Sequence, residues 1–193
     1  MDIGVCVASH VGDIDYVVRA EELGYSHAWL ADSQMLWSDC YAALALVADR
    51  TSTINIGTGV SVSGTRPAPV TAASIATINA LAPGRTFLGL GTGNTAMRIM
   101  GHKPQRIAEF DQYLEAIKPL LKGEEAEHSF GGHVSPIRHI MPDKGFVNFE
   151  DPIPLYVSGF GPKSLALAGK HADGAVLSIP PDTQAMDRTW EMI

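Results

Sequence analysis

The chain has 193 residues, of which 46% are hydrophobic and 18% are charged, which suits one globular domain with a sizeable core. Its formal net charge of -7 argues against a nucleic-acid or anionic-membrane partner. No apolar run approaches the ~20 residues of a membrane span, and the N-terminus lacks the basic region of a signal peptide.

Short apolar runs alternate with helical patterns along the chain. We predict strands at residues 3–8, 27–31, 54–62, 86–90, 153–157 and 174–179. We predict helices at residues 13–23, 41–50, 69–81, 107–121 and 162–171, with a further helix beginning at 182. Asp13 and Gly24 are suited to cap and close the first helix, and Pro119 is expected to bend or fray the last turn of the fourth.

The strands are short and almost continuously apolar, which is typical of parallel strands covered on both faces. Six βα units suit either a doubly wound sheet or a barrel, in one domain over residues 1–193. Residues 124–151 are rich in Gly, Pro and His and have little periodicity, so we predict a long inserted loop. Its three histidines lack the spacing of a zinc site, so no metal is expected. Cys6 and Cys40 predict reduced thiols in a cytoplasmic protein, with Cys6 in a buried strand.

In a parallel α/β fold the ligand site lies beyond the carboxyl ends of the strands. One such end, residues 158–164, follows a strand and opens a helix, with Pro162 at the first helical position. The free amides of the helix, its positive dipole end and Lys163 together predict an anion site suited to a cofactor phosphate. The alternative is a tight turn that simply needs glycine.

Two other strand ends carry weaker signals. Residues 89–94 resemble a dinucleotide fingerprint, but their glycines lack the spacing G-x-G-x-x-G. Asp32 could bond to a cofactor hydroxyl or a substrate, or it could cap the next turn. By position, His10 and Asp32 are the best-placed candidates for proton transfer. The absence of a G-x-S-x-G elbow and of a P-loop motif excludes an α/β-hydrolase and a P-loop nucleotide hydrolase.

Taken in order, several stretches resemble the luciferase-like monooxygenase superfamily, which includes flavin-dependent monooxygenases and deazaflavin-dependent methylenetetrahydromethanopterin reductases. The matching stretches are 29–34, 56–60, 65–74, 84–85, 88–93, 154–158, 161–163 and 167–174. The resemblance implies an α/β protein of the (β/α)₈ TIM-barrel type. It also implies a flavin- or deazaflavin-dependent oxidoreductase or monooxygenase, with FMN or coenzyme F420 as cofactor and a small organic substrate.

The resemblance also implies where the cofactor lies. The ring would lie across the barrel mouth near Asp32, the third strand end and residues 91–94, and the phosphate on residues 161–164. A non-prolyl cis peptide is expected at about Gly59–Val60. The implied cofactor-binding residues are Asp32, Gly59, Val60, Ser61, Gly91, Thr92, Gly93, Asn94, Ser158, Gly159, Gly161, Pro162, Lys163 and Ser164.

The chain departs from such a barrel in length, since barrels of this type have ~250 residues. The pattern stops after about six βα units, as in a fragment or a natural short form. Its first and sixth strands would then be open edges, which predicts a homo-oligomer. Two alternatives to the enzyme stay open: a non-catalytic flavin-binding protein or inactive fragment, and, less well supported, a nicotinamide-dependent Rossmann dehydrogenase.

Overall fold

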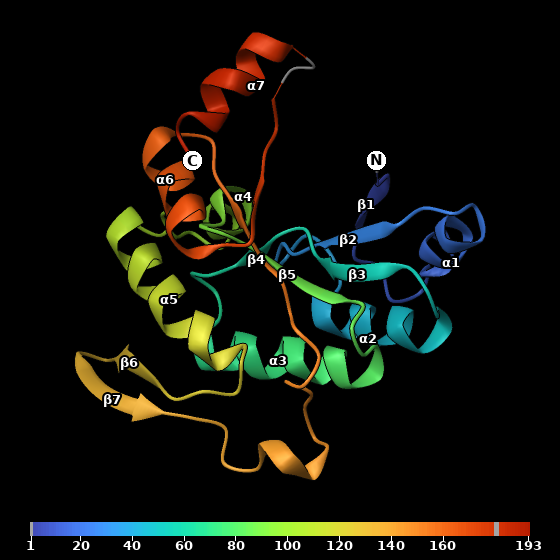
Figure 1. Cartoon of the computed structure of the whole chain (residues 1–193), viewed down its shortest axis with the longest axis horizontal. Helices are drawn as coiled ribbons and strands as arrows, with labels where there is room; N and C mark the ends of the chain where they lie inside the picture. Colours follow the sequence, from blue (N-terminus) through green and yellow to red (C-terminus); the bar gives the residue numbers. More distant parts are fainter. Residues whose placement is uncertain (1, 180–181) are drawn as a thin grey trace.

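A parallel sheet curls around one side of the molecule in the computed structural model, which describes residues 2–179 and 182–193 (Figure 1). Its strands are β1 Gly4–Ala8, β2 His27–Ala31, β3 Asn55–Thr58, β4 Ser61–Val62, β5 Thr86–Gly91, β8 Leu155–Ser158 and β9 Gly174–Val176. The helices are α1 Asp15–Glu22, α2 Cys40–Arg50, α3 Ala68–Leu81, α4 Asn94–Ile99, α5 Ile107–Leu120, α6 Pro162–His171 and α7 Thr183–Trp190. A separate hairpin, β6 Ala126–Phe130 with β7 His133–Ile137, precedes a short 3-10 helix at Pro142–Lys144.

The order of the strands decides between the two architectures. The sheet runs β1-β2-β3-β5-β8-β9, β4 pairs with β5, and every pair is parallel. The strands therefore follow sequence order without a switch point, as in a barrel and not in a doubly wound sheet. Within the described residues β1 and β9 do not pair with each other, so the barrel is open.

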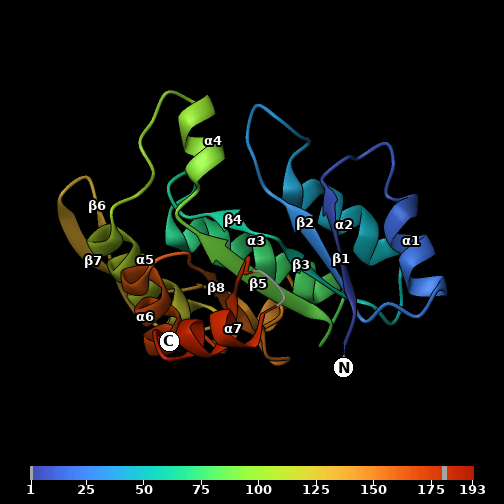
Figure 2. The same cartoon turned by 90° about the horizontal axis from the view of Figure 1, so that it is seen from above.

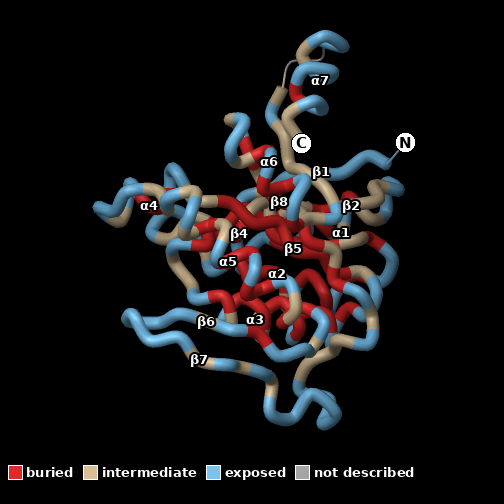
Figure 3. Tube along the Cα trace, turned by 60° about the vertical axis from the view of Figure 1, so that its left-hand side comes forward, coloured by how far each residue is buried: buried red, intermediate tan, exposed pale blue. Residues whose placement is uncertain are grey.

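Alternation along the strands separates an outer face from an inner face. The outer residues Leu30, Ile56, Leu88 and Val157 are at most 2% exposed and form the main core with the helices. Helices α1, α2, α3, α5 and α6 follow one another around this face, each packing against the next (Figures 1 and 2). The red segments of Figure 3 mark this buried layer.

The inner face carries an aromatic cluster at its amino-terminal end. The rings of Trp29 and Phe87 lie 4.3 Å apart between centroids, and Tyr156 lies 5.4 Å from Trp29 and 5.6 Å from Phe87. Gly57 makes room for Phe87, since a Cβ there would lie 2.3 Å from that ring. The cluster fills the bottom of the half-barrel and leaves the carboxyl ends of the strands for a ligand.

The opening of the sheet explains why the prediction for Cys6 is wrong. Cys6 lies in β1, as predicted, but its side chain is exposed. It points to the inner face, where no strand covers β1 on its free side within residues 2–179 and 182–193. Cys40, in contrast, is the first residue of α2 and is fully buried.

The start of helix α1 differs from the prediction. Helix α1 begins at Asp15, two residues late, and no side chain caps it, so the proposed role of Asp13 is wrong. The backbone N–H of Asp13 instead donates to the carbonyl of His10 in a turn. Gly24 does follow α1 with a positive φ of 81°, as its position predicted. Pro119 is accommodated in the last turn of α5, which ends one residue later.

The segment 124–151 contains more structure than the loop that we predicted. Gly131 and Gly132, with φ of 60° and 83°, form the turn of the β6–β7 hairpin. At the end of the segment, Asn79 of α3 donates from Nδ2 to the carbonyls of Asn148 (3.1 Å) and Asp151 (2.9 Å). Asn148 returns a bond from its Nδ2 to the carbonyl of Asn79 at 3.2 Å. This clamp fixes the base of the insertion to the outer helix layer.

Candidate functional site

The carboxyl ends of β2, β4, β5 and β8 surround one cavity of about 630 Å³. It contains most of the residues that the sequence singled out: Asp32, Gly59, Val60, Gly91, Thr92, Gly93, Asn94, Ser158, Gly159, Gly161 and Ser164. Of the other predicted residues, Ser61 is fully buried behind the wall, and Pro162 and Lys163 are exposed at the start of α6. The structure therefore brings the predicted cofactor residues together, except for these three.

The predicted third strand is two separate strands, and the break between them forms part of the cavity wall. Strand β3 ends at Thr58, a cis peptide joins Gly59 and Val60 as the resemblance implied, and β4 begins at Ser61. A Cβ at Gly91 would lie 2.9 Å from Cγ2 of Val60. Glycine at position 91 therefore lets β5 lie close to the cis peptide that joins β3 and β4.

Asp32 is the most heavily bonded side chain of the site, and its side chain is 2% exposed. Its Oδ1 accepts from Nε2 of Gln34 at 2.7 Å. Its Oδ2 accepts from Nη1 of Arg66 (2.6 Å), the backbone N–H of Val62 (3.2 Å) and Oγ of Ser61 (3.3 Å). Asp32 thus does not cap the following turn, and its bonds tie β2 to β4 instead. Its proposed catalytic role stays a prediction.

Arg66 extends this network to helix α2. Its Nη2 donates to Oδ2 of Asp39 at 2.8 Å, and its guanidinium lies 4.9 Å from the centre of the Tyr41 ring. Burial lowers the pKa of Arg66, but the charge of Asp32 and the bond to it outweigh this effect and leave the pKa raised. Burial raises the pKa of Tyr41, so its hydroxyl stays neutral and bonds to Oγ of Ser61 at 3.0 Å.

The loop after β5 is shaped by Gly93. This residue has a φ of 73°, and a Cβ would lie 2.1 Å from Cγ1 of Val62. The chain turns there directly into α4, a helix that sequence periodicity did not predict. From α4, Arg98 reaches the cavity wall and donates from Nε to Oδ1 of Asn94 at 2.6 Å.

The turn before α6 is where the sequence predicts an anion site, and that role stays a prediction. Oγ of Ser164 donates to the carbonyl of Gly161 at 2.9 Å and accepts from the backbone N–H of Gly161 at 3.3 Å. Gly161 has an extended φ of -120°, and a Cβ there would meet no atom within 4 Å. The turn itself therefore does not need glycine at 161, although it does at 159, where a Cβ would lie 2.9 Å from Oγ of Ser164. Space is open in front of the helix N-terminus.

His10 does not lie with the other candidates. It is exposed on the turn after β1 and lines a second cavity, of about 700 Å³, together with Asp13 and Tyr16. Trp37 lines both this cavity and the one at the strand ends. His10 and Asp32 are therefore on different sides of the β2–α2 loop.

Sequence reasoning assigned no role to Arg66, Arg98 or Trp37. Arg66 appeared only within a stretch of family resemblance, and it meets a partner 34 residues away. No local pattern signals such a pairing. One signal could have suggested the pair: an arginine shortly after one strand end, when the neighbouring strand end carries an aspartate.

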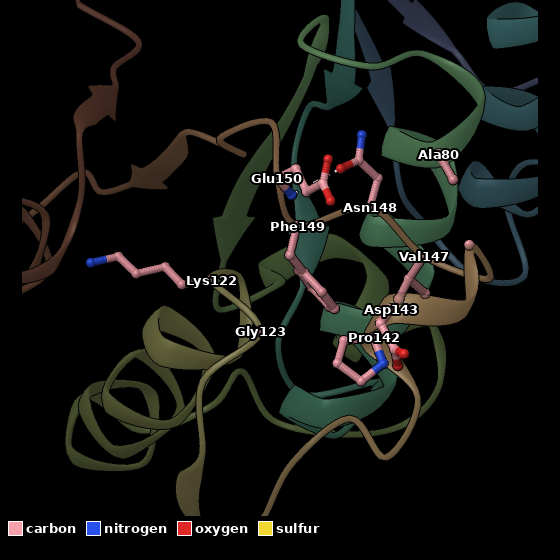
Figure 4. Close-up of a pocket in the computed structure, with 10 residues that line it drawn as sticks. Ala80, Lys122, Gly123, Pro142, Asp143, Val147, Asn148, Phe149 and Glu150 are labelled. Atoms are coloured by element: carbon pink, nitrogen blue, oxygen red, sulfur yellow. Dashed lines mark hydrogen bonds between the residues drawn. The ribbon is translucent and has the colours of Figure 1, made fainter.

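A third cavity, of about 640 Å³, lies away from these residues (Figure 4). It is lined by Ala80 near the end of α3, by Lys122 and Gly123 after α5, and by residues 142, 143, 145 and 147–150. The helices run opposite to the strands, so this cavity lies at the amino-terminal edge of the sheet. It has the same size as the strand-end cavity but no buried ion pair, so volume alone does not identify the site.

The sequence model of the luciferase-like monooxygenase family matches residues 12–191. A 5,10-methylenetetrahydromethanopterin reductase of Methanolobus tindarius is 31% identical over 172 residues, which cover 84% of this chain and 48% of that protein. An F420-dependent hydroxymycolic acid dehydrogenase of Mycobacterium tuberculosis is 34% identical over 174 residues, covering 83% and 47%. This chain thus spans about half the length of the curated relatives it matches.

Solved structures share the fold at lower identity. A coenzyme F420-dependent tetrahydromethanopterin reductase from Methanopyrus kandleri has a TM-score of 0.72 and 23% identity, with 90% of this chain and 55% of that chain covered. A type II Baeyer-Villiger monooxygenase from Pseudomonas putida, in complex with FMN, has a TM-score of 0.74 and 18% identity, with 100% and 60% covered. The fold of these structures agrees with the open barrel seen here, in which β1, β2, β3, β5, β8 and β9 are neighbours in sequence order.

Proposed function

Because this chain belongs to the luciferase-like monooxygenase family, we propose that it is a flavin- or deazaflavin-dependent oxidoreductase acting on a small organic substrate. One observation carries the proposal: the segment between β3 and β4 and the turns after β5 and β8 all line one cavity of about 630 Å³. The bound cofactor would supply hydride transfer or oxygen activation at its ring. The protein would supply binding, orientation and exclusion of water.

The residues of the cavity fit such a cofactor. Glycines at 91 and 93 let the chain at the end of β5 lie against Val60 and Val62, and these four residues together form one wall of the cavity. The open space at Gly161 lies at the positive dipole end of α6, which suits a phosphate. Ser164 and the exposed Lys163 are positioned at the same helix start to add a hydroxyl and a positive charge.

The cofactor is FMN or coenzyme F420. Two curated relatives carry names that state F420 dependence or a methanopterin-reductase activity, and one solved neighbour holds FMN. The deciding experiment is an absorption spectrum and a mass spectrum of the cofactor extracted from purified protein, followed by titration of the stripped protein with each compound. A stripped protein that binds neither compound would refute the proposal.

We assign His10 and Asp32 as candidates for proton transfer at opposite sides of the β2–α2 loop. His10 would act from the second cavity, which shares Trp37 as a lining residue with the first. A His10→Gln variant that turns over substrate at the wild-type rate, with the same pH profile, would remove His10 from this role.

We also propose a homo-oligomer in the cytoplasm. Each of the edge strands β1 and β9 pairs on one side only within the described residues, and such edges recruit other chains. Cys6 and Cys40 are both free, which suits a reducing compartment. No helix of the described chain has the length and apolar character needed to cross a membrane. Sedimentation equilibrium tests the oligomer, and a stable monomer at micromolar concentration would contradict it.

A non-catalytic flavin-binding protein is the second candidate. The observation that favours it is the exposed inner face of β1, which leaves the cavity wall incomplete on that side of the described structure. Such a protein would bind the cofactor without turnover. Reduction of the bound chromophore by a candidate substrate, followed by absorbance, separates the two functions.

A further inference from the structure

Arg66 joins two carboxylates that come from different elements. Its Nη1 donates to Asp32 at 2.6 Å and its Nη2 to Asp39 at 2.8 Å. The Arg66 side chain is 14% exposed, against 2% for Asp32 and 56% for Asp39. The planar fork of arginine presents a separate N–H group to each acid in a fixed direction, whereas a lysine offers a single point charge.

Asp32 transmits this contact to the cavity wall. Its Oδ2 accepts from the backbone N–H of Val62 as well as from Arg66. Val62 lines the cavity and packs against α4 through Ala96 and Met97. The position of β4, and with it one wall of the cavity, therefore depends on these hydrogen bonds of the Asp32 carboxylate.

The same pair determines the charge of the wall. A buried carboxylate without a partner would place one negative charge beside the cavity, where screening by water is weak. Arg66 cancels this charge at a distance of 2.6 Å. A flavin or deazaflavin ring gains electron density when it is reduced, so an uncompensated Asp32 would oppose its reduction.

We propose that Arg66 is a positioning residue for the cofactor: through Asp32 it fixes β4, and it compensates the buried negative charge beside the ring. This inference rests on the proposed function, since it concerns a bound flavin or deazaflavin. It gives Asp32 an anchoring role in the wall, which does not depend on proton transfer by Asp32.

The test compares four variants with the wild type, using FMN and coenzyme F420 as probes. Arg66→Met removes the charge, Arg66→Lys keeps the charge without the fork, and Asp32→Asn combined with Arg66→Met removes both charges. Arg19→Met is the matched control, because Arg19 forms a comparable pair with Glu22 at 2.8 Å on the exposed surface of α1. The dissociation constant comes from fluorescence titration, and the midpoint potential of the bound cofactor from equilibration with a reference dye.

Arg66→Met should weaken cofactor binding about tenfold or more, the loss of one charge-assisted contact, and shift the midpoint potential to more negative values. Arg66→Lys should weaken binding but keep the potential close to that of the wild type. The double variant should return the potential toward the wild-type value, because the buried charge of Asp32 is removed together with that of Arg66, and Asp39 is largely exposed to water. The control should match the wild type in both measurements.

The outcomes separate the two levels of the proposal. A wild-type protein that binds neither probe overturns the proposed function. A wild-type protein that binds, together with an Arg66→Met variant whose affinity and potential equal those of Arg19→Met, overturns only the role of Arg66. If Arg66→Met does not fold, the lysine and double variants decide, and a double variant with a strongly lowered potential contradicts the charge argument.

Discussion

Glu21 is expected to make the stability of the protein depend on acid pH. Its Oε1 accepts from three backbone N–H groups, those of Ser52 (2.8 Å), Thr53 (2.6 Å) and Ile54 (3.0 Å), and from Oγ1 of Thr53 (2.9 Å). This one carboxylate thus fastens α1 to the turn before β3. Burial raises the pKa of Glu21, but the hydrogen bonds outweigh burial and lower the pKa from 4.5 to about 2.

The size and sign of the effect follow from that difference. A fall of roughly 2.5 pKa units corresponds to about 3.4 kcal/mol at 1.36 kcal/mol per unit, which is an upper limit. Glu21 is partly exposed, and solvent screening reduces the expected contribution to about 1.5 kcal/mol. The folded pKa lies below the unfolded one, so this stability is fully present above pH 4.5 and is lost as the pH falls toward 2.

The assay is urea unfolding of the wild type and of Glu21→Gln at pH 7 and at pH 3. The variant should be less stable by about 1.5 kcal/mol at pH 7, and this difference should shrink by about half or more at pH 3. Glu22→Gln is the control, because Glu22 lies on the same helix in an exposed pair with Arg19. A difference between wild type and Glu21→Gln that is the same at both pH values would refute the electrostatic explanation.

Three further outcomes are expected. Gly93→Val should lower the free energy of unfolding by roughly 2 kcal/mol or more, since position 93 has a positive φ and faces Val62, and thermal melting measures this loss. In a thiol-labelling assay on the native protein, Cys6 should react quickly and Cys40 only after unfolding, and equal rates would contradict the open inner face of β1. Lys163→Ala should weaken cofactor binding by about 1–3 kcal/mol in calorimetry, and an unchanged affinity would place the phosphate elsewhere.

The sequence predicted best those elements whose signals are local. Helix α6 was predicted at its observed bounds, because Pro162 marks its start and an apolar face runs through it. Helix α4 was missed, since its six residues are too few to show a period. The β6–β7 hairpin was missed because β6 and β7 carry His, Ser and Pro instead of the residues that favour strands.

The candidate site was predicted in part, for a related reason. Strand ends can be read one at a time, and parallel strands bring their ends together, so the glycine-rich turns were found. The pair of Arg66 and Asp32 depends instead on a contact across 34 residues. The exposure of Cys6 depends on whether the sheet closes, which no single strand reveals.

The clamp between Asn79 and residues 148–151 makes the β6–β7 hairpin suitable for peptide insertion. Asn79 is fully buried and holds the base of the insertion by two bonds of 3.1 and 2.9 Å. Strand β8 begins at Leu155, a few residues after the clamp. The clamp therefore separates changes in the hairpin, which precedes it in the chain, from the sheet. The turn at Gly131 and Gly132 is exposed, and a Cβ at either position would meet nothing within 4 Å. A reporter peptide or an affinity handle inserted there would extend away from the strand-end cavity and leave its walls as they are.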